Sequence, residues 1–131
     1  HKLGGKAMDG LYATMTVQNP YLDEASQPIR FWASKYKTKF NEDPTVFSVY
    51  GYTIITSFAT AAGRAGKNLT TDSFIKVMDN LTIEPDFFGG AVQTFSATKR
   101  LGSDASRLSQ IVDGKWKTVS DYFGSTATAK K

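Results

Sequence analysis

The feature that most constrains this chain is the absence of any charged residue between positions 45 and 63. A run of this kind approaches the ~20 apolar residues that a membrane-spanning helix needs. Threonines and serines interrupt the run, however, and small residues are frequent in its second half. We therefore expect a helix that is buried on most sides within a protein and packs closely against other backbone. Gly63 and Gly66 stand where a left-handed cap would end it.

The residues before this run predict one strand and one helix. Residues 11–17 alternate in character with a period of two, which favours a strand. A helix should follow, with Ser26 as its cap and Pro28 in its first turn. The stretch 35–40 allows an alternative, a strand whose lysines and aromatic rings would suit nucleic acid. The helix is favoured because its apolar positions recur at helical spacing without a break: Ile29, Trp32, Tyr36 and Phe40.

The residues after the run predict a short third helix and a strand. Thr70 and Thr71 are suitable caps for a helix whose apolar positions are Phe74, Ile75 and Met78. Residues 80–84 are expected to form a connector, and residues 91–95 a strand.

A β-hairpin near the end is the clearest local prediction. Asp113-Gly114 supplies the positive φ angles that a two-residue hairpin turn needs. Strands are expected on either side, over 108–112 and 115–119. Residues 124–131 are expected to form a disordered tail.

The predicted order is a strand, three helices, a strand and a β-hairpin, which indicates an α/β fold. With 131 residues, 40% of them hydrophobic, the chain is long enough for one domain. Three apolar helix faces need more sheet than these few strands supply. We infer that the covering elements come from elsewhere, either from more of the same protein or from another subunit.

The residues that most enzymes rely on are missing from this chain. It has no cysteine, and its single histidine is His1, a terminal residue. The segment 63–68 departs from the phosphate-binding loop pattern, because Ala61 stands at the first glycine position and Asn68 replaces Ser or Thr. Glu84 and Asp86 flank a proline, as acidic turn residues often do. We expect no catalytic residue, no metal site and no cofactor.

Charge and termini limit the remaining classes. The net charge of +4 and the pI of about 9.3 raise the question of nucleic acid, but the lysines are spread along the chain and form no basic face. We therefore expect no nucleic-acid partner. No signal peptide is visible and no initiator methionine is present, so we expect either a processed start or a fragment.

Four motifs, in order along the chain, resemble a known family. They are DGLYAT at 9–14; Phe31-Trp32 through to Glu42-Asp43-Pro44; Tyr50-Gly51-Tyr52 with the small residues of 59–66; and Gly89-Gly90 through to QIVDGKW at 110–116. Over roughly residues 3–122 the chain resembles the C-terminal segment of type I periplasmic solute-binding proteins, the branched-chain amino-acid-binding family of ABC importers. Members of that family are far longer than this chain.

The resemblance implies two α/β lobes joined by three crossing segments, with the ligand bound between lobes that close by hinge motion. On that basis residues 1–18 form an interlobe crossing strand and residues 19–85 the helical part of the N-terminal lobe. Residues 86–123 supply strands and the C-terminal hairpin, and residues 124–131 the tail. The chain would then be a fragment, without enzymatic activity, of a bacterial periplasmic or extracytoplasmic protein.

The same resemblance implies a ligand site at the start of the central helix. Phe47 matches a position that touches the ligand's apolar side chain in amino-acid binders, with ordinary core packing as the alternative. Ser48 and Tyr50 lie beside it, where a hydroxyl or a helix amide would meet an anionic group. The expected partners are an amino acid or small, possibly aromatic, organic acid, the missing N-terminal part or another subunit, and an ABC permease. A ligand-sensing receptor of the same fold and a basic interaction module are the alternatives.

Overall fold

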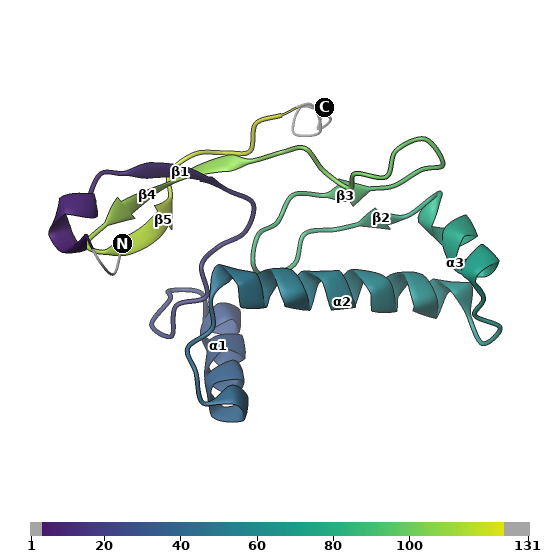
Figure 1. The fold of residues 1–131 in the computed structure, drawn as a ribbon, viewed down its shortest axis with the longest axis horizontal. Helices are drawn as coiled ribbons and strands as arrows, with labels where there is room; N and C mark the ends of the chain where they lie inside the picture. Colours follow the sequence, from purple (N-terminus) through teal and green to yellow (C-terminus); the bar gives the residue numbers. More distant parts are fainter. Residues whose placement is uncertain (1–3, 125–131) are drawn as a thin grey trace.

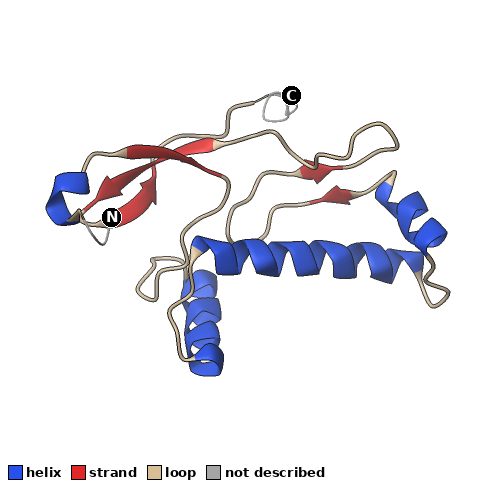
Figure 2. Cartoon of the chain, in the orientation of Figure 1, coloured by secondary structure: helices blue, strands red, loops and turns tan. Residues whose placement is uncertain are grey.

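The computed structural model describes residues 4–124, which contain three α-helices and two small β-sheets. Figure 1 shows an elongated arrangement with one sheet at one end and the long helix α2 running along the other part. Helix α1 stands steeply across the start of α2, and the second sheet lies alongside α2 (Figures 1 and 2). The strands are few for this amount of helix, as the sequence predicted.

Helix α1 spans Gln27–Phe40 and confirms the first predicted helix. Pro28 lies in its first turn, while the side chain of Ser26 makes no capping hydrogen bond. The helix ends at Asn41, which adopts a left-handed conformation with φ 55°. Because residues up to Phe40 are helical, the alternative strand over 35–40 is wrong.

Helix α2 spans Val46–Ala65 and confirms the helix predicted from the uncharged run. Gly66, with φ 81°, follows its last residue, whereas Gly63 lies inside the helix and does not cap it. The expected burial on most sides is not met within this chain, because only Val49 and Ala61 are buried. Four large side chains on one side are exposed by more than half and define what we call the apolar face: Phe47, Ile54, Ile55 and Phe58.

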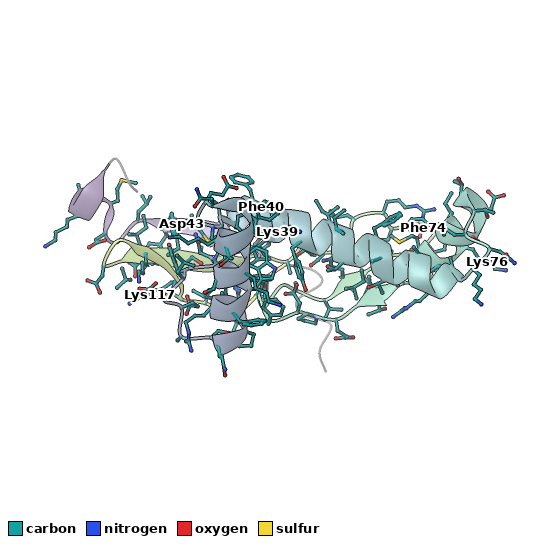
Figure 3. The ribbon with its side chains drawn as sticks, turned by 90° about the horizontal axis from the view of Figure 1, so that it is seen from below. Lys39, Phe40, Asp43, Phe74, Lys76 and Lys117 are labelled. Carbon is teal, nitrogen blue, oxygen red and sulfur yellow. The ribbon has the colours of Figure 1, made fainter. Side chains whose placement is uncertain are left out.

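Helix α3 spans Thr71–Met78. Thr70 is its cap, because the amide of Ser73 donates to Thr70 Oγ1 at 3.1 Å, and Thr71 is its first residue. Figure 3 shows Phe74 on this helix, next to the far end of α2. There its ring lies 5.3 Å from that of Phe58, so α3 packs against α2.

The first sheet, sheet A, joins the two ends of the described chain. Its antiparallel order is β1 (Tyr12–Met15), β4 (Arg107–Val112) and β5 (Lys115–Thr118). The hairpin prediction is confirmed, with Asp113 at φ 53° and Gly114 at φ 71° in the turn. The first predicted strand is confirmed but shorter than 11–17. A 3-10 turn, η1 (Gly5–Met8), precedes it.

The second sheet, sheet B, pairs β2 (Thr82–Ile83) with β3 (Gln93–Thr94). The prediction of a plain connector over 80–84 is therefore wrong, and the strand predicted over 91–95 is reduced to two residues. The two strands pair with each other, with Thr82 opposite Thr94. Each has only two residues, which is too short to show the alternating pattern of a strand. Because β2 falls in the range 19–85, that range is not purely helical. Of the predicted tail, only Gly124 lies among the described residues.

The core lies where the segment after β1 and the loop between β2 and β3 pack against α1 and the start of α2. Val17, Ile29, Val49 and Phe88 are buried together, with Trp32 packed against them. The rings of Trp32 and Phe88 meet edge to face, with centroids 5.0 Å apart, a favoured aromatic geometry. This cluster anchors α1 and the beginning of α2, and so determines where the start of α2 lies.

Candidate ligand-contact region

The start of α2 carries the three residues singled out in the sequence, and Phe47 is the most accessible of them. Its side chain is 76% exposed, so ordinary core packing within this chain does not explain it. Its ring meets that of Tyr50 edge to face, with centroids 6.1 Å apart. The structure thus brings Phe47 and Tyr50 together as an aromatic pair at the beginning of the helix.

Ser48 is occupied by a structural role. Its Oγ accepts a hydrogen bond from the Thr45 amide at 3.1 Å, one half of a capping box that satisfies an amide at the helix start. A hydroxyl engaged in this way has limited freedom to bind an anion. Ser48 therefore caps the helix, whereas Phe47 and Tyr50 beside it form the aromatic pair.

Tyr50 links the helix to the segment that follows β1. The hydroxyl of Thr16 donates to the Tyr50 hydroxyl at 3.3 Å, and the ring is half-buried. Tyr50 also lines an open groove of about 440 Å³ between α2 and the segment that contains sheet B. Phe47 and Ser48 do not line this groove, so the three predicted residues do not form a single pocket within the described chain.

Hydroxyl groups dominate the helix side of the groove: Thr53, Thr56, Ser57 and Thr60. Thr56 Oγ1 donates to the Tyr52 carbonyl at 2.9 Å and Thr60 Oγ1 to the Thr56 carbonyl at 2.8 Å. Thr53 Oγ1 is buried without a partner among the described residues. The polar side of α2 thus faces this chain's own strands, while its apolar face points away from them.

Two acidic residues lie on the opposite side of the groove. Asp86 Oδ1 accepts the amide of Phe88 at 2.9 Å, the turn geometry that aspartate commonly provides. Glu84 is exposed. Neither residue is paired with a base or nucleophile in this groove, and no cluster of three metal-ligating side chains occurs within residues 4–124.

Sequence reasoning missed several residues that shape this region. Thr16 supports Tyr50, yet in the sequence it is one more residue of an alternating strand. The threonines of α2 were noticed only as interruptions of an apolar run, although their spacing places them on one side of a helix. Recognising that side as the wall of a groove requires the position of sheet B next to α2, and the predicted strand over 91–95 does not reveal that position.

The described residues thus form an α/β unit with an open groove beside α2 and an exposed apolar face on the same helix. The chain belongs to the periplasmic binding protein family, because the model of that family matches residues 1–115. This family of solute-binding proteins is non-enzymatic and extracytoplasmic. The resemblance seen in the sequence and the expectation of no enzymatic activity are therefore confirmed by the family.

Two solved structures share the fold. A putative branched-chain amino acid ABC transporter from Rhodospirillum rubrum aligns with 90% of this chain at 21% identity and a TM-score of 0.63. A branched-chain amino acid ABC transporter from Thermus thermophilus, solved with bound valine, aligns with 96% at 16% identity and a TM-score of 0.66. The aligned region is only 33% and 36% of those two chains. The chain thus corresponds to about a third of each structure, and the predicted α/β fold class is confirmed.

No curated protein matches the chain. Among the helices of residues 4–124, none has the length and hydropathy needed to cross a membrane.

Proposed function

We propose that this chain is the C-terminal segment of a bacterial periplasmic solute-binding protein that delivers its ligand to the permease of an ABC importer. The observation that carries the proposal is the family match over residues 1–115. We propose an amino acid or another small organic acid as the ligand. The Thermus thermophilus relative, whose structure holds valine, supports this choice of ligand class.

The missing part of the protein would lie against the apolar face of α2. Phe47, Ile54, Ile55 and Phe58 expose between 54% and 76% of their surface, and burying each such side chain contributes about 1.5–3 kcal/mol. A parallel sheet, covered by helices on both sides, is the element that such a face suits. We propose that the N-terminal part of the same protein, or a separate subunit, supplies it.

Within the complete protein, Phe47 would form an apolar wall against the ligand's side chain. Its exposure and its edge-to-face contact with Tyr50 support this role. Tyr50, held by Thr16, would fix the position of Phe47, and Ser48 would shape the helix start through its cap. The chemistry is a difference in affinity between open and closed states, without covalent change.

A thermal-shift screen of amino acids and small carboxylates against the longer protein that contains this segment tests the proposal. A ligand at a hundred times its Kd should stabilise the protein by about 2.7 kcal/mol, which appears as a clear rise in Tm. We expect at least one amino acid or organic acid to give this rise. A folded protein that responds to none of these compounds would contradict the proposed function.

Substitution of Phe47 tests its assigned role in the same protein. Phe47→Ala should weaken binding of the identified ligand about 10- to 100-fold, because an apolar ring buried against the ligand is lost. Phe31→Ala is the matched control, since Phe31 is also exposed, at 63%, but lies on α1. Equal affinities of the two variants, measured by calorimetry, would remove Phe47 from the site while leaving the ligand assignment intact.

A further inference from the structure

Sheet A connects to the rest of the molecule through a small cluster of contacts that we call the junction: residues 16–18, 88–89, 106–107 and 122–123. Three strand-flanking segments meet a loop here. The amide of Gln18 donates to the Phe88 carbonyl at 3.0 Å. Ser106 and Phe123 exchange two backbone hydrogen bonds of 2.9 and 2.8 Å. The geometry of the junction therefore contributes to how sheet A is placed relative to the helices. A second connection runs from β5 to residues 21–23, where the amide of Trp116 donates to the Tyr21 hydroxyl and Lys115 pairs with Asp23.

Tyr122 occupies the centre of the junction. Its hydroxyl lies 2.7 Å from the Thr16 carbonyl and 2.6 Å from the Gly89 carbonyl. A phenol has one proton to donate, so the two carbonyls share a single donor. Thr16 follows β1, whereas Gly89 belongs to the loop beside the helical core. One hydroxyl group therefore ties the segment after β5 to both sides of the junction.

Arg107 holds the ring of Tyr122 in place. Its guanidinium carbon lies 4.9 Å from the ring centre, a cation–π distance, and its Nη2 lies 3.5 Å from the Phe88 carbonyl. Arg107 is only 8% exposed, and its Nε has no hydrogen-bond partner among the described residues. A buried cation held in this way restricts where the tyrosine ring can lie.

Gly89 makes this close arrangement possible. Its φ is +65°, which residues with a side chain rarely adopt, and a Cβ there would lie 3.4 Å from Arg107 Nη2. Burial raises the pKa of the Tyr122 hydroxyl above its ordinary value of 10.0. The hydroxyl consequently keeps its proton at neutral pH and remains a donor.

We infer that Tyr122 is the positioning residue of the junction. Its one hydroxyl proton is shared between the Thr16 and Gly89 carbonyls, and this sharing holds the segment after β5 against both sides of the junction. The bearing of Tyr122 on closure around a ligand rests on the proposed function, but its positioning role does not.

Amide hydrogen exchange of Tyr122→Phe, in the chain as it stands and without ligand, tests the inference. The amides of Gln18, Ser106 and Phe123 should exchange about 2- to 10-fold faster, the range expected for one lost hydrogen bond. Amides paired between β4 and β5, such as those of Gln110 and Lys117, should keep their rates. Tyr12→Phe is the matched control, because Tyr12 lies on β1 and is 57% exposed; it should change neither group.

Two results would overturn the inference. One is unchanged junction rates in a folded Tyr122→Phe protein. The other is an equal acceleration at the junction and in the hairpin, which would make Tyr122 a contributor to global stability only. If circular dichroism shows that Tyr122→Phe does not fold, Arg107→Met decides the matter, since it keeps the hydroxyl but frees the ring: the same local acceleration is expected, and its absence rejects the inference. Because no ligand is used, this outcome is independent of the proposed function.

Discussion

Two tyrosines show what partial burial does to individual side chains in this protein. Tyr21 accepts the amide of Trp116 at 2.9 Å through its hydroxyl oxygen, and desolvation raises its pKa above 10.0. Burial likewise raises the pKa of Tyr122. Both hydroxyls bridge segments far apart in the chain, but they differ in what ionisation would do. Tyr122 donates to two carbonyls, so its ionisation would remove that connection as well as create a partly buried charge. Tyr21 accepts the Trp116 amide, so its ionisation would keep that hydrogen bond and create only the partly buried charge.

We expect the two tyrosines to titrate later than exposed ones when the pH is raised. For a group whose folded pKa lies above its unfolded value, the stabilisation is complete below the unfolded pKa, near 10, and is lost as the pH rises through the folded value. Tyrosinate absorbance should show a late alkaline phase that shrinks in Tyr21→Phe and in Tyr122→Phe. A late phase that is unchanged in both variants would contradict the assignment.

For individual residues, the sequence shows which side chains could act at a site better than it shows which other residues they contact. Its motifs drew attention to Phe47, Ser48 and Tyr50, but the capping role of Ser48 depends on the exact start of the helix. The contact between Thr16 and Tyr50 spans 34 positions, and no local pattern reveals it. Tyr122 passed unnoticed, because its importance comes from two backbone carbonyls that only the fold brings to it.

Among the helices and strands, two glycines allow a direct test of local backbone conformation, because one stands at a positive φ angle and the other lies inside a helix. Gly114 has φ 71° in the hairpin turn, whereas Gly51 lies inside α2, where a Cβ would meet no other atom within 4 Å outside its own stretch of helix. Gly114→Ala should lower the free energy of unfolding by about 1–2 kcal/mol, the penalty of a left-handed alanine. Gly51→Ala should raise it by about 0.5–1 kcal/mol, since alanine is the better helix former.

Urea unfolding of the two variants beside the parent chain measures both changes. Opposite signs are expected. A loss of stability in Gly51→Ala would mean that its surface is already packed in this chain, contrary to the exposure of the apolar face.

The elements that the sequence predicted well are those with local causes. Helical spacing defined α1, the absence of charge defined α2, and Asp113-Gly114 defined the hairpin. Strand β2 could not be predicted in this way, because two residues cannot display a period, and for β3 the sequence predicted the position but too great a length. Their pairing depends on the loop between them returning next to α2.

For the whole molecule, the apolar face of α2 should govern behaviour in solution. Ile54 and Ile55 are 66% and 65% exposed, and contiguous exposed patches of this kind promote association. We expect the isolated chain to self-associate, and Ile55→Glu to weaken that association about tenfold or more through the lost apolar contact. Sedimentation velocity over a concentration series measures the effect.

Leu101→Glu is the control for this experiment. Leu101 is equally exposed, at 65%, but lies in the loop before β4 rather than on the apolar face, so its variant should associate like the parent. A parent chain that is monomeric at every concentration, with a cooperative unfolding transition, would contradict the proposal that this face is built to be covered.

The pairing of β1 with β4 has a consequence for how the protein is made. Gln110 Nε2 donates to the Gly10 carbonyl across 100 positions of the chain, and the β1–β4 ladder lies beside this contact. During synthesis β1 therefore leaves the ribosome long before its partner exists, and contacts of such long range form slowly. Sheet A can therefore close only after β4 has been synthesised, roughly 100 residues behind β1.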